Sequence, residues 1–136
     1  MSIEESVVAR MLAYDELTDL IGEGADMRLY PLVIPQDAAL PAVAYQKISS
    51  PKTQSHSGSS NLAHSRFQFT CAADTYAEVK EVANAVRHCW DSYAGTVNYL
   101  KIGHTAIEND SDSERAIEAT AVPVVRLDVV MWHQED

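Results

Sequence analysis

The hydrophobic pattern changes its period within the stretch from His64 to Tyr93, and the change predicts a strand followed by a helix. In the first half, apolar or small residues alternate with polar ones, as in a strand with one buried face. The side expected to be buried consists of Ser65, Phe67, Phe69 and Cys71, and the polar side of His64, Arg66, Gln68 and Thr70. We therefore expect a half-buried strand here.

The second half predicts an amphipathic helix, because its apolar residues recur every three or four positions. They are Tyr76, Val79, Val82, Ala83, Val86, Cys89, Trp90 and Tyr93. Thr75 and Glu78 have the spacing of a capping box at the start, and Gly95 marks the end. A helix and a strand with these faces can exclude water by packing on each other. The expected core is Phe67, Phe69, Val79, Val82, Val86 and Trp90.

The remaining periodic segments extend this nucleus to a single α+β domain over residues 1–136. Helices are expected over 3–13 and 15–21, and further strands over 27–30, 42–48, 96–108 and 121–136. The strand over 96–108 is expected to kink at Gly103, and the acidic residues 109–114 to form a loop. These elements predict an antiparallel or mixed sheet of four to five strands, with the helices packed on one face.

Residues 49–63 predict a mobile arm between two strands. The segment is rich in Ser and contains a single Leu, so it cannot bury enough apolar surface to offset the entropy of ordering it. It is also much longer than an ordinary hairpin loop of about two to five residues. We expect a hairpin arm that becomes ordered against a partner, with contacts from His56, Ser57, Ser59 and Ser60.

Composition and charge exclude several classes of protein. The chain has 20 acidic and 10 basic residues, a net charge of −10 that disfavours binding to nucleic acid. It has neither an apolar stretch of the roughly 20 residues that span a bilayer nor an N-terminal secretion signal, so a soluble protein made in the cytoplasm is expected. Cys71 and Cys89 fall on the expected buried faces and are interpreted as free, buried thiols.

The sequence contains no enzymatic signature of the common kinds, such as GxxxxGKS/T, GxGxxG, GxSxG or HExxH. His56 lies beside several serines, but a nucleophile needs rigid support and this segment predicts the opposite. The acidic segment 109–114 differs from a calcium loop, since Arg115 and Ala121 stand where Gly and Glu are required. We expect no catalytic residue, metal or cofactor. A zinc site remains an alternative if His64 and His104 meet across neighbouring strands.

Polar residues on the exposed side of two strands form the main candidate site. They are Arg66, Gln68 and Thr70 on the central strand, and Arg126 and Asp128 on the last one. Such a face can be an ordinary solvated surface. It can also be a subunit interface, because these side chains can form hydrogen bonds and ion pairs between subunits.

Two segments in this order resemble a family of small tail-completion, or tail-terminator, proteins of long-tailed bacteriophages. The first reads RLYPLVIPQDAALPAVAYQKIS, and the second, after the Ser-rich segment, reads HSRFQFTCAADTYAEVKEVANAVR. The resemblance covers roughly residues 3–93, and the C-terminal third departs from it.

The resemblance implies a structural role without an active site. Members form a ring, typically of six subunits, that caps the tail tube, stops its polymerisation and joins it to the head-side connector. Six chains of this charge would carry on the order of −60, so DNA would pass through the ring without binding. The implied partners are further copies of the chain, the tail tube protein and the connector. The implied location is the virion tail or neck, after assembly in the host cytoplasm.

Two alternatives to a tail terminator stay open. The chain can be another neck, connector or minor tail component, which is the same structural class. It can also be a small metal-binding or ligand-binding α+β domain, or an enzyme, that uses His64 and His104.

Overall fold

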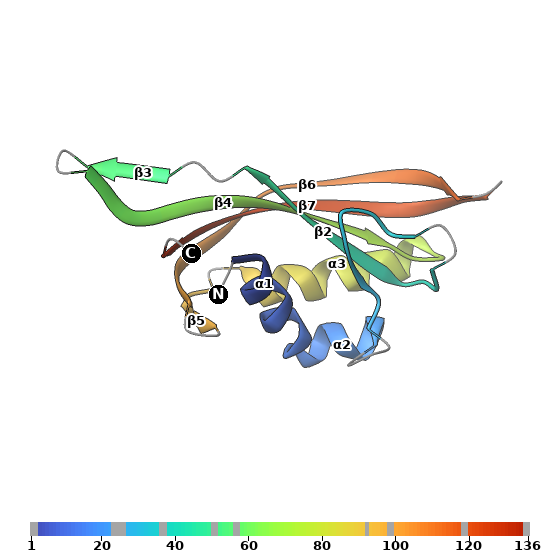
Figure 1. Ribbon diagram of the computed structural model, residues 1–136. Helices are drawn as coiled ribbons and strands as arrows, with labels where there is room; N and C mark the ends of the chain where they lie inside the picture. Colours follow the sequence, from blue (N-terminus) through green and yellow to red (C-terminus); the bar gives the residue numbers. More distant parts are fainter. Residues whose placement is uncertain are drawn as a thin grey trace.

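Three helices lie against one face of a long, curved sheet in the computed structural model (Figure 1). The structure describes residues 3–22, 27–35, 38–49, 52–55, 58–91, 93–97, 100–117 and 120–134. Its helices are α1 (Ile3–Leu12), α2 (Asp15–Ile21) and α3 (Tyr76–Trp90). Its strands are β1 (Leu29–Pro31), β2 (Ala42–Ser49), β3 (Lys52–Ser55), β4 (Gly58–Ala72), β5 (Gly95–Val97), β6 (Leu100–Ile117) and β7 (Thr120–Gln134). The class is α+β, with the helices on one face as predicted.

The sheet is mixed and has more strands than the four to five predicted. Its order is β1-β2-β4-β7-β6-β5, and β3 lies beside β4. All pairs are antiparallel except β1 and β2. The expected single strand over 96–108 is wrong, because β5 and β6 are separate antiparallel strands that pair Gly95 with Ile102. Short strands such as β5 depend on their neighbours and carry little periodic signal of their own.

The acidic segment 109–114 is part of β6, so the predicted loop is wrong. Asn109 pairs with Asp128, and the register continues to Glu114 opposite Pro123. The neighbouring strand supplies partners for the backbone, and this tertiary contribution overrides the low strand propensity of Asp and Asn. The predicted irregularity near Gly103 is present as a shift of register between Ile102 and His104.

The Ser-rich arm contains a β-hairpin. Strand β3 pairs with the first part of β4, from Lys52 opposite Ala63 to Ser55 opposite Gly58. Figure 1 shows this hairpin extending away from the helices at one end of the sheet. Ser59 and Ser60 lie in β4, whereas His56 and Ser57 lie outside the described residues. The mobility of the arm stays a prediction.

The core lies between α3 and the middle of the sheet. Phe67 and Phe69 on β4 are fully buried, as is Trp90 on α3. The ring of Phe69 lies 6.3 Å from each of the other two rings, centre to centre. The six residues expected in the core all belong to this cluster, which β7 completes with Val125, Leu127, Val129 and Met131.

A second, smaller apolar cluster covers one end of the opposite face of the sheet. The connection from β1 to β2 crosses this face (Figure 1) and places Ile34 against it. The sheet contributes Ala42, Ala44, Ala72, Val122 and Val124. The sequence predicted an extended connection here, without indicating that it covers the sheet. The remainder of this face, called the open face below, carries the polar residues singled out from the sequence.

No helix in the described ranges is long and apolar enough to cross a membrane.

Candidate functional site

A network of polar side chains occupies the open face at the middle of β4, β7 and β6. Arg66 donates from one guanidinium nitrogen to both carboxylate oxygens of Glu108, each at 3.2 Å. Its other terminal nitrogen lies 3.8 Å from Asp128 Oδ2, and Gln68 Nε2 donates to Asp128 Oδ1 at 3.4 Å. These side chains are partly exposed, and pairs of that kind each contribute at most about 1 kcal/mol to stability. The network therefore adds little to the stability of the fold.

The strand register brings together all five polar residues predicted on the two strands. Gln68 lies opposite Asp128, and Thr70 opposite Arg126, while Arg66 is two positions along β4. Glu108 also belongs to the network but was not predicted there. Residue 108 was expected at the end of a strand whose place in the sheet was unknown. Only the order of strands in the sheet places Glu108 beside Arg66.

An exposed aromatic cluster lies at the end of the open face nearer the arm. The ring of Trp132 on β7 lies 5.9 Å from His64 on β4 and 5.5 Å from His104 on β6. Trp132 is 39 % exposed. Because β7 separates the other two strands, the hypothesis that His64 and His104 meet across neighbouring strands is wrong. Among the described residues, no group of three or more His, Cys, Asp or Glu is arranged to hold a metal ion.

A second exposed apolar feature lies at the tip where the chain leaves β1. Leu32 and Val33 are 64 % and 65 % exposed. Leu32 has a φ of 68°, which is uncommon for a residue with a large side chain. Its backbone N–H donates to the Tyr45 carbonyl at 2.8 Å, and this bond holds the tip against β2. This conformation could not be predicted from the sequence, because Leu has no preference for positive φ.

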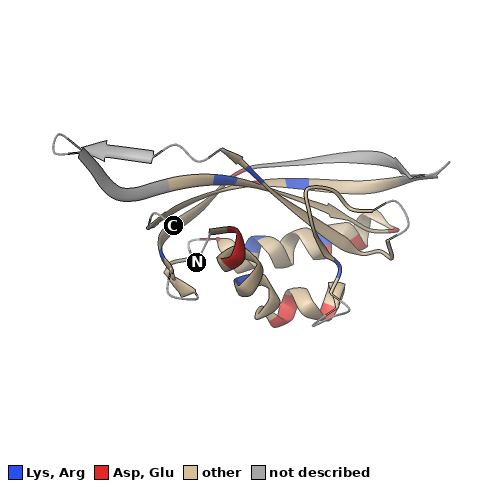
Figure 2. Cartoon of the chain, viewed as in Figure 1, with Lys and Arg blue, Asp and Glu red and all other residues tan. Residues whose placement is uncertain are grey.

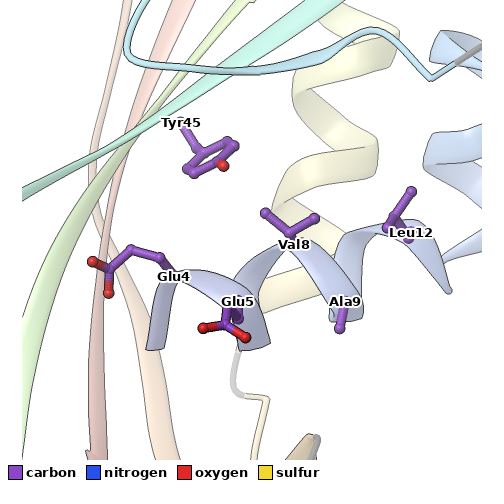
Figure 3. A pocket seen from close by; sticks show the side chains of 6 residues that line it. All are labelled: Glu4, Glu5, Val8, Ala9, Leu12 and Tyr45. Carbon is purple, nitrogen blue, oxygen red and sulfur yellow. The ribbon is translucent and has the colours of Figure 1, made fainter. Parts of the chain in front are cut away.

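Two open grooves lie beside the helices. One, of about 370 Å³, runs between α1 and β2 and is lined by Glu4, Glu5, Val8, Ala9, Leu12 and Tyr45 (Figure 3). The other, of about 360 Å³, lies between α2 and α3, where His88 Nδ1 is 2.9 Å from the Glu16 carboxylate. The polar side chains of both grooves are largely exposed to solvent. They offer negatively charged contact surfaces.

A serine and a histidine form a hydrogen-bonded pair inside the core. Ser65 Oγ and His133 Nε2 are 2.7 Å apart, and the two residues are 0 % and 1 % exposed. Buried polar groups are stabilised by such partners, and a site without access to solvent cannot admit a substrate. The pair therefore belongs to the structure of the core. The alternation of residues predicted that Ser65 is buried but did not predict its pairing with His133.

The chain is similar to known proteins over most of its length. Residues 5–131 match the family model described as tail completion protein gp17. No curated protein sequence matches. Nineteen chains of solved structures match, among them a chain from the virion of a native gene transfer agent particle. That match has a TM-score of 0.72 and 18 % sequence identity, and covers 98 % of this chain and 93 % of the other.

Proposed function

The chain belongs to the tail completion protein gp17 family, a structural rather than enzymatic component of phage tails, and we propose that it forms a ring that caps the tail tube. The observation that carries this proposal is the family match, which spans nearly the whole domain. The similarity to a chain of a gene transfer agent virion supports the fold.

The proposed mechanism depends on two different ring surfaces. One face of the ring matches the last layer of tube subunits, whereas the other lacks the surface on which a further tube layer would form. Addition of the ring therefore ends polymerisation, and the free face receives the head-side connector. A ring of six copies is the arrangement expected from the family resemblance.

Exposed features of the open face and of the tip after β1 support assembly. Side chains that are about two-thirds exposed and apolar, such as Leu32 and Val33, gain free energy when a partner covers them. The network around Arg66 can exchange its internal pairs for pairs between subunits. A mixture of apolar anchors and polar pairs is typical of protein interfaces.

The charge of the chain supports passage of DNA without binding. Figure 2 shows the acidic segments of the described chain mostly on the helices, whereas basic segments occur on the helices as well as on strands of the sheet. With −10 for each copy, six copies carry on the order of −60. Such a ring repels the phosphate backbone over the Debye length of roughly 10 Å at moderate salt.

Solution mass and negative-stain images of the purified chain test the proposal. We expect ring-shaped particles whose mass is a multiple of the 15.0 kDa chain and whose fraction grows with concentration. Addition of tail tubes should give tubes closed at one end. A chain that stays monomeric at every concentration and leaves tube growth unchanged would contradict the proposal.

Deletion of residues 55–60 should reduce ring formation and give tails of irregular length. The deletion removes the tip of the arm, where Ser55 pairs with Gly58, and leaves the buried core intact. The measurements are thermal unfolding, solution mass and tail length by electron microscopy. A length-matched Gly-Ser replacement of the same residues separates the effect of sequence from that of length. Normal rings and tail lengths in the deletion variant would show that the arm is dispensable.

Labelled electron microscopy distinguishes the tail terminator from a neck or connector component. A label on the chain should lie at the end of the tube for a terminator. A label at the portal side would identify the chain as a connector component.

A further inference from the structure

The sheet is only four strands wide at its middle, where β2 and β6 are the outer strands. The outer edge of each is unpaired there. Strand β1 pairs with β2 only at residues 43–45, and β5 pairs with β6 only at residues 100–102. Within the described chain, no strand pairs with the outer edge of β2 over residues 46–49 or of β6 over residues 103–117.

The two free edges lie at the same level of the sheet. Lys47 on β2 pairs with Phe67 on β4, Phe67 pairs with Val129 on β7, and Val129 pairs with Ile107 on β6. The side chains of Gln46 and Lys47 on β2 and of Glu108 on β6 are exposed. Free edges present unpaired N–H and C=O groups that readily accept another strand, and proteins normally block or cover them.

The segments that contain the two edges have opposite net charge, although Lys47 already lies 3.4 Å from Glu4 of α1 and Glu108 lies 3.2 Å from Arg66. Residues 42–63, which include β2 and β3, contain Lys47 and Lys52 and no Asp or Glu. Residues 102–117 of β6 contain four acidic residues and one Arg; the acids are Glu108, Asp110, Asp112 and Glu114. Residues 42–63 are therefore a positively charged segment in a chain with a net charge of −10. Two copies can therefore bring segments of opposite net charge together.

We propose that the β6 edge of one copy pairs with the β2 edge of the next copy, so that the sheet continues from subunit to subunit. The proposal rests on the ring of the proposed function and names the surface that builds it. Strands β2 and β6 run in opposite directions within one chain, because three antiparallel pairs separate them. Rotation about an axis along the strands keeps these directions, so the new pair is antiparallel as well.

A second copy fits these edges better than an unrelated partner. The two edges belong to the same chain, lie at the same level and are parts of segments with opposite net charge. A contact between two different surfaces of identical subunits is heterologous, and it closes into a ring when the rotation permits. In a closed ring every β2 and β6 edge is paired. The Arg66 network then lies close to the new junction on the open face. It extends from β4 across β7 to β6, the strand that pairs with the next copy.

Engineered cysteines test the pairing in the full-length chain. Gln46 is combined with one cysteine on β6, at His104, Ala106 or Glu108, three positions that share the open face. Within one chain, residues 46 and 108 are three strand spacings apart, about 14 Å, whereas a disulfide needs Cα atoms within about 7 Å. The native thiols, Cys71 and Cys89, are buried and do not compete. Any disulfide between the introduced cysteines therefore joins two copies.

We expect mild oxidation of Gln46→Cys combined with the correctly registered β6 variant to give a ladder of covalent oligomers up to the ring size. Each single variant should give no ladder, because the contact is between unlike edges. The matched control combines Glu108→Cys with Asn84→Cys, which lies on the exposed side of α3 and should not crosslink.

The outcomes separate this proposal from the proposed function. Rings in the images without a ladder from any of the three pairs would overturn the edge pairing and leave the ring intact. Efficient covalent dimers from Glu108→Cys alone would replace it with a symmetric contact between two β6 edges. Absence of rings for the unmodified chain, with and without tail tubes, would overturn both.

Discussion

Replacing Trp90 by alanine should lower the free energy of unfolding by about 3–5 kcal/mol. Trp90 is fully buried where α3 meets the sheet, with its ring 6.3 Å from that of Phe69 and 5.8 Å from that of Tyr93. Truncation removes the transfer free energy of a large side chain and leaves a cavity between two layers that cannot fully collapse. Denaturant unfolding followed by far-UV circular dichroism measures the change.

Two control variants separate the packing contribution from other effects. Trp90→Phe should cost less, because it keeps an aromatic ring and removes the buried indole N–H, which has no hydrogen-bond partner in the described structure. Asn84→Ala, on the exposed side of the same helix, should change stability by no more than about 0.5 kcal/mol. Equal losses for Trp90→Ala and Asn84→Ala would contradict a core centred on Trp90.

Stability should fall steeply between pH 9 and pH 12 because of the two buried thiols. Burial raises the pKa of Cys71 and of Cys89 from 9.0 to about 12, and Arg10 partly opposes this shift at Cys89. Above pH 9 the thiols ionise in the unfolded chain but stay protonated in the folded one. The unfolded state therefore binds fewer protons, and stability decreases as pH rises. The contribution of the thiols to the free energy of unfolding is fully present below pH 9. Each thiol accounts for a loss of up to about 4 kcal/mol by pH 12.

Denaturant unfolding from pH 8 to pH 11.5 measures this dependence. A double variant, Cys71→Ala with Cys89→Ala, should be less stable at pH 8 because of its smaller core side chains, yet lose less stability as pH rises. Other ionising groups act equally in both proteins, so the difference between the two pH profiles isolates the thiols. Parallel profiles would show that the thiols are not responsible.

Several exposed features of the sheet are the basis of the proposed contact with further copies of the chain. They are the Arg66 network and Trp132 on the open face, the Leu32–Val33 tip after β1, and two strand edges that pair with no other strand of the described chain. The gain from each feature alone is small in water. In the proposed contact with a further copy, apolar burial and backbone pairing would add to each other.

Local periodicity was sufficient for the nucleus of the fold. The change of period near Thr75 correctly separated β4 from α3, and the capping hydroxyl of Thr75 accepts the Glu78 backbone N–H at 3.1 Å. The alternation on β4 correctly separated the buried from the polar residues, because side chains of a strand alternate between its two faces. On β7 the separation was incomplete, because Val130 lies on the side of Arg126 and Asp128 but is buried. The two N-terminal helices also lie within one residue of their predicted bounds.

Features that depend on contacts between distant segments could not be read locally. The acidic residues of β6 form a strand because β7 pairs with them, and β5 exists because it folds back on β6. The sequence placed Arg66, Gln68, Thr70, Arg126 and Asp128 on polar strand faces but could not say that these strands are neighbours. The order β4-β7-β6 decided this, and it also placed Trp132 between the two histidines expected to meet.

The amino-acid sequence by itself determined which side of each main strand and of α3 faces away from water, because burial follows the period of the side chains. It also determined, through its resemblance to a known family, the kind of structural role to expect. Only the tertiary structure decided which strands are neighbours and which edges stay unpaired. Strand pairing depends on backbone hydrogen bonds between residues far apart in the chain, and these leave no periodic trace in the sequence.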